Sequence, residues 1–173
     1  AVLTGVHLGS YGHDLGDRAG LLHLTQRILS ETRIPRVRLS SLEPWDIAPG
    51  FFELWQDERL CPHLHLPLQS GCNATLRRMR RNTSQADFRA IVEAARAAIP
   101  DLRLTSDVIV GFPGETDDEF AISEAFIKEM QFAGLHVFPY SSRPGTPAAR
   151  MKGHLPNAVK KERVHRLLAH AEQ

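Results

Sequence analysis

The sequence predicts an α/β protein with a parallel sheet, either a barrel or an open doubly wound sheet. Apolar runs rich in β-forming residues recur along the whole chain, and patterns with helical spacing separate them. Strands that alternate with helices are typical of right-handed βαβ units. The 173 residues, of which 42% are hydrophobic and 24% charged, suit one soluble globular domain.

The expected strands are apolar runs at residues 1–6, 36–39, 63–68, 102–110 and 135–138. Apolar residues at helical spacing predict a helix over residues 21–29, a shorter one over 51–55 and a third over 88–99. The N-cap of the third helix is expected at Thr83 or Ser84, since a hydroxyl there can accept a bond from a first-turn amide.

Two further helices complete the pattern. Thr116 and Glu119 have the spacing of a capping box, and Asp117 and Asp118 suit the positive end of the helix dipole, so a helix is expected from here to about residue 132. A last helix is expected from Asn157 to the end of the chain. Because residue 1 already lies in a strand pattern, the chain is expected to be a segment of a larger protein.

Parallel β/α proteins bind ligands at the carboxyl ends of their strands, which places the candidate site in the loops that follow the apolar runs. These loops are residues 5–12, 40–44, 69–72, 111–115 and 139–147. They are rich in glycine, serine, threonine and proline and poor in the usual acid, base and nucleophile sets. This composition favours binding of a cofactor over acid–base catalysis, and no catalytic residue is predicted.

Each candidate has a structural alternative. Residues 111–115 can bring backbone amides close to a ligand, or can form a tight turn before a well-capped helix. Gln69 and Ser70 can bond ribose hydroxyls or a carboxylate, or Ser70 can bond locally within a turn. In the long loop from Tyr140, Arg143 offers a cation for an anionic group. Glu43 is the best-placed carboxylate, although a lone carboxylate is usually solvated or ion-paired.

His63 and His65 alternate onto one face of a strand, but no third ligand accompanies them, and no metal site is predicted. The net charge is +1, so any basic surface is local. Most basic clusters are solvated faces, and nucleic-acid contact is the alternative. The two clusters here are Arg77, Arg78, Arg80 and Arg81, and Lys160, Lys161, Arg163 and Arg166.

Cysteine usage and the lack of targeting segments favour a cytoplasmic location. Cys61 and Cys72 form neither a CxxC pair nor a disulfide framework, which suits a reducing compartment. The sequence has neither a run of about eighteen apolar residues nor the features of a signal peptide.

Several strings together resemble the radical S-adenosylmethionine methylthiotransferases. They are LTGVHLGSYG (3–12), RLSSLEP (38–44), HLPLQSG (65–71) with LRRMRR (76–81), DVIVGFPGET (107–116) and YSSRPGTPAA (140–149). The first two look most like the subgroup that modifies N6-threonylcarbamoyladenosine beside the tRNA anticodon. The resemblance covers nearly the whole chain.

The resemblance implies a partial (β/α)6 barrel of the radical SAM type that lacks the first strand and the cluster loop. Residues 1–173 would supply strands two to six, while cluster domains upstream and a C-terminal RNA-binding module lie outside the segment. S-adenosylmethionine would lie across the strand ends. The implied contacts are Gly5 and His7 at the methionine end, Glu43 near the polar end, Gln69 and Ser70 at the ribose or carboxylate, Ile109, Gly111 and Phe112 at the adenine, and Phe138, Tyr140 and Arg143 at the far rim.

The family's iron–sulfur clusters need a CxxxCxxC loop and three further cysteines, which this segment does not contain. Cys61 and Cys72 cannot replace them, because three thiolates must converge on one cluster. The ligands of the [4Fe–4S] clusters are therefore expected outside the segment, which alone is expected to be inactive.

For the intact enzyme, the resemblance implies that a radical generated from S-adenosylmethionine removes hydrogen from C2 of the modified adenine, where a methylthio group is then placed. The implied partners are tRNA, contacted by Arg77, Arg80 and Arg81, and an electron donor such as a flavodoxin or ferredoxin; no membrane partner is expected.

Three other functions remain open from the sequence. One is a ribosomal-protein methylthiotransferase of the same family. Another is a cluster-free β/α barrel enzyme that binds phosphate or nucleotide at residues 111–116. The third is a non-catalytic barrel that binds a partner through its arginines.

Overall fold

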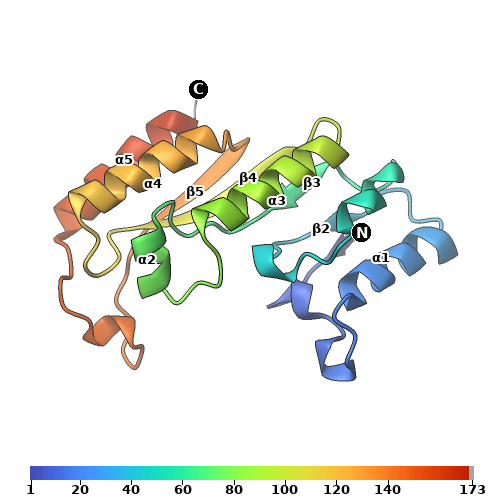
Figure 1. The fold of residues 1–173 in the computed structure, drawn as a ribbon, viewed down its shortest axis with the longest axis horizontal. Helices are drawn as coiled ribbons and strands as arrows, with labels where there is room; N and C mark the ends of the chain where they lie inside the picture. The colour runs from blue at the N-terminus through green and yellow to red at the C-terminus, as the bar shows by residue number, and fades with distance from the viewer. Residues whose placement is uncertain (172–173) are drawn as a thin grey trace. The chain divides into compact units, whose positions relative to one another are not determined.

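Strands and helices alternate in the computed structural model, which describes residues 1–171 (Figure 1). The strands are β1 (Val2–Leu3), β2 (Arg38–Leu39), β3 (His63–His65), β4 (Arg103–Val110) and β5 (Gly134–Pro139). The α-helices are α1 (Gly20–Glu31), α2 (Asn73–Arg78), α3 (Gln85–Ala98), α4 (Asp117–Glu129) and α5 (Asn157–Ala171). None of the helices in this range is long and apolar enough to cross a membrane.

The chain divides into two compact units. The first unit contains Ala1–Pro67 and Ala90–Thr105. The second contains Leu68–Arg89 and the described residues from Ser106 onward. Strand β4 and helix α3 each run from one unit into the other, so the division falls within elements and not at a linker.

The first unit carries parallel strand pairs. β1 pairs with β2, and β3 pairs with the start of β4, with His63 opposite Arg103. Ser41, just after β2, forms a parallel bridge with His65. The core of this unit is built from apolar side chains of the strands and of the helices that cover them, among them Leu39, Leu42, Phe51, Leu64, Leu66, Val92, Ala95, Ile99 and Leu104.

In the second unit, the far part of β4 bonds to β5 and forms a parallel bridge between Val108 and Gln69. Helices α4 and α5 lie side by side, and α5 packs along β5 (Figure 1). Phe88 contacts the rings of Phe126 and Phe132 edge to face, at centroid distances of 6.3 and 6.1 Å. The parallel α/β class predicted from the sequence is therefore confirmed.

Some predicted strands are shorter in the structure. β1 covers Val2–Leu3 of the expected residues 1–6, and these two residues pair in register with Arg38 and Leu39 of β2. β3 ends at His65, where residues up to 68 were expected. In the second unit, the Leu68 amide donates to the Ser106 hydroxyl at 3.0 Å, so a side chain interrupts the regular ladder.

Some helix boundaries also differ from the prediction. Phe51–Gln56 forms a 3-10 helix where a short α-helix was expected. α4 ends at Glu129 and not near residue 132, because Gln131 has a φ of 45°, which an α-helix cannot contain. The predicted last stretch of α5, residues 172–173, lies outside the described part of the chain.

The predicted helix starts are confirmed in atomic detail. The Glu119 amide donates to the Thr116 hydroxyl at 3.2 Å, and the Glu119 carboxylate accepts the Thr116 amide at 3.2 Å, which is a complete capping box. Of the two proposed caps for α3, Ser84 is used. Its hydroxyl accepts the Asp87 amide at 3.2 Å, and Asp87 accepts the Ser84 amide at 3.0 Å.

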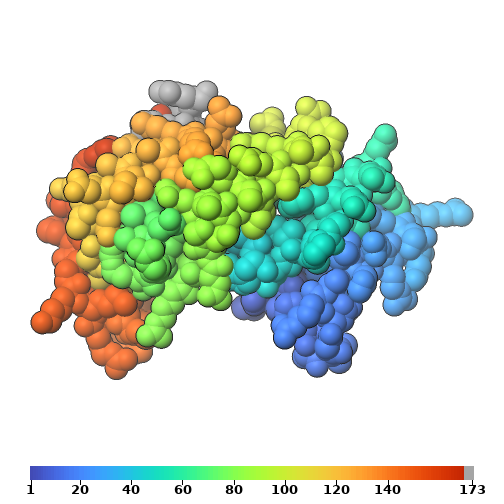
Figure 2. Space-filling model, in the orientation of Figure 1, coloured from blue at the N-terminus to red at the C-terminus, as the bar shows by residue number. Residues whose placement is uncertain are grey.

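Helix α2 was not predicted; the first basic cluster begins with Arg77 and Arg78 at its end and continues with Arg80 and Arg81 just after it. Leu76 is buried beneath it, whereas Arg77 and Arg80 are exposed and Arg81 is half-buried. Arg78 does not point to solvent, as the sequence suggested, but forms an ion pair with Glu119. The green segment that contains these arginines lies at the surface on the face shown in Figure 2.

Candidate functional site

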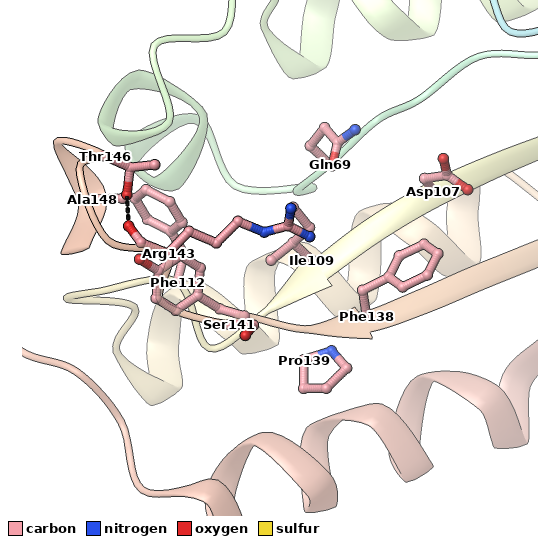
Figure 3. A pocket seen from close by; sticks show the side chains of 11 residues that line it. Gln69, Asp107, Ile109, Phe112, Phe138, Pro139, Ser141, Arg143, Thr146 and Ala148 are labelled. Carbon is pink, nitrogen blue, oxygen red and sulfur yellow. Dashed lines mark hydrogen bonds between the residues drawn. The ribbon is translucent and has the colours of Figure 1, made fainter.

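The candidate site is a cavity of about 510 Å³ in the second unit, at the carboxyl ends of β4 and β5. A cavity of this size is within the range of small-molecule sites, about 300–1,000 Å³. Figure 3 shows the side chains that surround it. The lining residues are Gln69, Asp107, Ile109, Phe112, Phe138, Pro139, Tyr140, Ser141, Arg143, Thr146 and Ala148.

Strand alternation along β4 selects which of its side chains reach the cavity. Ser106, Val108 and Val110 are buried, whereas Asp107 and Ile109 are half-exposed and share the opposite face. Asp107 Oδ1 lies 3.0 Å from His136 Nδ1 on β5. The cavity thus receives one carboxylate and one aliphatic side chain from this strand.

Aromatic side chains form the wall nearest the two loops. The rings of Phe112 and Tyr140 meet edge to face, with centroids 5.3 Å apart and planes at 74°. The Tyr140 amide donates to the Val110 carbonyl at 2.8 Å, which extends the pairing of the two strands up to the cavity. The Tyr140 hydroxyl is buried without a hydrogen-bond partner among the described residues, which is a costly arrangement that a ligand atom can relieve.

Gln69 reaches the cavity from a strained backbone. Its φ is 66°, a conformation that non-glycine residues adopt at a cost of about 1–3 kcal/mol. The strain is held by two bonds to β4, from the Gln69 amide to the Asp107 carbonyl and from the Ile109 amide to the Gln69 carbonyl, both 2.8 Å long. These bonds fix the backbone that presents the Gln69 side chain to the cavity (Figure 3).

Arg143 brings a cation to the apolar cavity. Its side chain extends toward Ile109 in Figure 3, and its carbonyl accepts the Thr146 hydroxyl at 2.8 Å, the bond drawn there as a dashed line. That bond and the one from the Thr146 amide at 3.2 Å order the loop. Apolar walls with one amide, one carboxylate and one guanidinium suit a ligand that combines a flat ring system with polar and charged groups.

Two predicted contact residues lie behind the cavity wall and not on its surface. Ser70 is fully buried, and its hydroxyl accepts the Cys72 amide at 3.2 Å, as in the local-turn alternative. The Gly111 amide donates to Glu115 Oε2 at 2.6 Å. Gly111 has a φ of 72°, and a Cβ there would lie 2.3 Å from Lys160 Cγ, so only glycine fits.

Glu115 is a buried charge at the base of this wall. Burial raises the pKa of its carboxyl, an effect that the bonds from Gly111 and Arg163 only partly offset. Arg163 Nη1 lies 2.5 Å from Glu115 Oε2, and both side chains are 2% exposed. Arg163 also bonds Asp117 at 2.6 Å.

The second basic cluster is therefore not a solvated face throughout, and that prediction is wrong for part of it. Arg163 is buried, and Lys160 is half-buried. Arg166 bonds Glu124 at 2.6 Å, while Lys161 is exposed. Arg163 and Arg166 are held by acidic side chains distant in sequence, and Lys160 donates to the Tyr140 carbonyl, so these three side chains are not simply solvated.

The remaining predicted site residues belong to the first unit. Gly5 and His7 are exposed, and His7 Nε2 lies 2.5 Å from Asp46 Oδ2. Glu43 is half-buried directly before a 3-10 helix that starts at Pro44. These positions follow β1 and β2, as a site at the strand ends requires.

His63 and His65 share one face of β3, as the sequence predicted, and both contact Thr105. His65 Nδ1 lies 2.8 Å from the Thr105 hydroxyl, and His63 Nε2 lies 2.9 Å from an Arg38 nitrogen. Burial, and then the Arg38 charge, lower the pKa of His63 to about 4. At Nε2, the Arg38 guanidinium occupies the place that a metal ion would take.

Sequence reasoning missed five cavity residues, namely Asp107, Pro139, Ser141, Thr146 and Ala148. Asp107 was detectable, because it lies two positions before Ile109 on the same face of β4. The other four lie in the segment around the predicted Tyr140–Arg143 loop, where no periodicity indicates side-chain direction.

The fold and the cavity define a β/α protein that binds a ligand at its strand ends, and comparison with known proteins gives its class. The model of the radical SAM superfamily matches residues 5–127, and the chain belongs to that superfamily. Coproporphyrinogen III oxidase (HemN) from Escherichia coli, a radical SAM enzyme, has a similar structure, with a TM-score of 0.65 and 21% identity over 86% of this chain and 35% of that one. This similarity confirms the predicted radical SAM type of fold.

Curated relatives are more similar in sequence. The threonylcarbamoyladenosine tRNA methylthiotransferase MtaB of Bacillus subtilis is 46% identical in an alignment of 173 residues that covers 99% of this chain and 38% of that protein. The protein of the same name from Thermotoga maritima is 42% identical over 94% of this chain and 37% of its own. The tRNA-2-methylthio-N(6)-dimethylallyladenosine synthase of Parafrankia sp. is 45% identical over 95% and 34%. The chain thus spans little more than a third of the relatives it matches.

Proposed function

We propose that this chain is the core segment of a tRNA-modifying methylthiotransferase that acts on C2 of N6-threonylcarbamoyladenosine next to the anticodon. The observation that carries the proposal is the 46% identity to the Bacillus subtilis enzyme of that name along 99% of this chain. The segment would supply strands two to six of the barrel. The cluster domains and the RNA-binding module would belong to the rest of the protein.

The cavity in the second unit fits the adenosyl part of S-adenosylmethionine. Ile109, Phe112 and Phe138 provide apolar surface for a purine, and the buried Tyr140 hydroxyl needs a partner that a polar ligand atom can supply. Gln69 offers an amide for ribose hydroxyls, and Arg143 offers a cation at the rim. Bound S-adenosylmethionine, together with an iron–sulfur cluster, supplies the radical chemistry of this superfamily.

The chain's own cysteines do not fit a cluster. Cys61 and Cys72 are both buried, and the Cys61 sulfur accepts a hydrogen bond from Arg36 Nε at 3.3 Å. Two thiols are also fewer than the three that must converge on one cluster. What the described residues contribute is binding, orientation and exclusion of water around the adenosyl group.

The sequence-based proposal that Gly5, His7 and Glu43 contact the cofactor concerns residues of the first unit, and it rests on the family motifs that contain them. They follow β1 and β2, whose carboxyl ends are the expected place for ligand contacts. His7 is held by Asp46, which fixes the ring beside the loop backbone. Ser70 and Gly111 would support the cavity wall and not touch the ligand, Ser70 through its bond to the Cys72 amide and Gly111 through its bond to Glu115.

The proposed reaction predicts a change in tRNA composition. Deleting the gene that encodes this chain should remove the 2-methylthio group from N6-threonylcarbamoyladenosine, while the unmethylthiolated nucleoside accumulates. Mass spectrometry of digested tRNA measures both nucleosides. A plasmid with the full-length gene should restore the modification, and unchanged nucleoside levels in the deletion strain would refute the proposed substrate.

A second substrate, N6-dimethylallyladenosine, is favoured by the 45% identity to the Parafrankia synthase. The same digest distinguishes the two, because the two 2-methylthio nucleosides differ in mass. Loss of the dimethylallyl derivative alone would transfer the proposal to this second substrate. If both 2-methylthio nucleosides remain and a ribosomal protein loses its methylthio group, the chain would instead belong to a ribosomal-protein methylthiotransferase.

The arginines around α2 are the proposed contacts to tRNA. Replacing Arg77, Arg80 and Arg81 with alanine in the full-length enzyme should weaken tRNA binding and reduce the slope of log affinity against log salt by up to about 3, about 1 per lost phosphate contact. Filter binding at several salt concentrations measures the slope. Alanine at the exposed Arg33, Arg103 and Lys161 removes the same charge and is the control; equal slopes for both triple variants would return the cluster to a solvated face.

A further inference from the structure

The first half of α5 contacts both loops that carry the aromatic wall of the cavity. α5 packs along β5 and beside α4 (Figure 1). It begins at Asn157, whereas the match to the superfamily model ends at residue 127. The family match therefore gives no role for α5, and its role at the cavity is inferred from the contacts that it makes.

Lys160 joins the two loops directly. Its Nζ donates to the Tyr140 carbonyl at 3.0 Å, at the point where β5 ends and the cavity loop begins. The stem of the same side chain packs against Gly111, since Lys160 Cγ lies 2.3 Å from where a Cβ on that glycine would be. One half-buried side chain thus contacts the loop after β4 and the loop after β5.

Arg163, one helical turn further on, holds the loop after β4 through its acidic end. Its Nη1 bonds the Glu115 carboxylate at 2.5 Å and the Glu115 carbonyl at 3.3 Å. Because Glu115 also accepts the Gly111 amide at 2.6 Å, a continuous chain of bonds runs from α5 to the residue before Phe112. The guanidinium also lies over the Phe120 ring, 4.9 Å from its centroid.

The segment that leads into α5 adds a backbone contact to the same loop. The Gly114 amide donates to the Gly153 carbonyl at 2.8 Å. Gly153 has a φ of 82°, and a Cβ there would come within 3.1 Å of the Gly114 nitrogen. Three independent contacts therefore connect residues 111–115 to the α5 region.

We infer that Lys160 and Arg163 are positioning residues for the S-adenosylmethionine cavity, and that α5 holds its two aromatic loops in the binding geometry before the cofactor arrives. The inference rests on the proposed function of the cavity. Phe112 directly follows the anchored Gly111, and the carbonyl that Lys160 bonds is that of Tyr140 itself, so each anchor fixes one ring of the edge-to-face pair. A wall ordered in advance spares the ligand the entropy of ordering it, which raises affinity without adding a contact.

The inference is tested in the full-length enzyme with Lys160→Met. Methionine keeps the stem that packs on Gly111 and removes the donor to Tyr140. The dissociation constant for S-adenosylmethionine, measured by equilibrium dialysis, should rise about tenfold. The KM for the cofactor should rise in parallel, kcat at saturation should change little, and amide hydrogen exchange in residues 140–147 should become faster.

Lys161→Met is the matched control, because it removes the same charge from the next, exposed position of the same helix. It should bind the cofactor as the wild type does, and Lys160→Arg, which restores a donor, should recover most of the affinity. A dissociation constant for Lys160→Met within twofold of the wild type overturns the inference, as does failure of arginine to rescue. A wild type that binds S-adenosylmethionine but leaves tRNA unmodified overturns the proposed substrate alone.

Discussion

Alanine in place of Gly111 is expected to destabilise the second unit by about 3 kcal/mol, the sum of a left-handed backbone strain and an overpacked contact. The φ of Gly111 is 72°, and the new Cβ would lie 2.3 Å from Lys160 Cγ and 2.9 Å from its Cδ. Either the loop or the lysine must move, and both position residues of the cavity wall, so the change should also disturb the cavity. Native-state hydrogen exchange of α5 amides in the full-length enzyme measures the loss.

Gly16→Ala is the control that separates the two terms of this loss. Gly16 has a φ of 82°, and a Cβ there meets nothing within 4 Å. Its replacement should cost about 1 kcal/mol from backbone strain alone, measured by hydrogen exchange of the α1 amides in its own unit. If the Gly111 variant loses no more than the Gly16 variant, the contact between Lys160 and the loop does not constrain the protein in solution.

Replacing Arg163 with methionine is expected to cost about 3–5 kcal/mol, because it leaves a buried carboxylate without its partner. Both Arg163 and Glu115 are 2% exposed, so water cannot replace the lost charge. The same hydrogen-exchange measurement of α5 reports the effect. A loss below about 1 kcal/mol, the value of an exposed ion pair, would contradict the buried geometry.

The pH dependence of the Arg163→Met variant has a definite sign. Burial already raises the pKa of Glu115, and removing the guanidinium raises it further. The folded state then binds a proton at a higher pH than the unfolded chain, so the variant should regain stability as the pH falls through the folded pKa. Adding Glu115→Gln, which keeps an acceptor for the Gly111 amide, should recover part of the loss and abolish this dependence.

Local sequence signals predicted the elements well where neighbouring residues supply the energy. The capping box of Thr116 and Glu119 and the cap at Ser84 form as expected, because both partners lie within one helical turn. β4 covers Arg103–Val110, close to the expected residues 102–110. Boundaries were wrong where a distant partner or an unusual φ decided them, as at β1 and at Gln131.

The candidate site was predicted in part. Six of the residues proposed for the cofactor, Gln69, Ile109, Phe112, Phe138, Tyr140 and Arg143, line the cavity of the second unit. Ser70 and Gly111 do not, because Ser70 is buried and bonded within its own turn and Gly111 packs against Lys160 with a left-handed φ. Sequence spacing gives the loop in which a residue lies, and backbone geometry decides which of its neighbours faces the ligand.

By itself, the sequence determined the order of strands and helices, the strand-end loops that carry the site and the superfamily, because these follow from periodicity, caps and motif strings. Tertiary structure alone decided which charged side chains are buried in ion pairs and which are exposed. Arg163 has the same sequence context as the exposed Lys161, yet it is buried against Glu115, 48 residues earlier in the chain. The burial of a charge depends on a partner brought close by the fold, and local patterns contain no record of that partner.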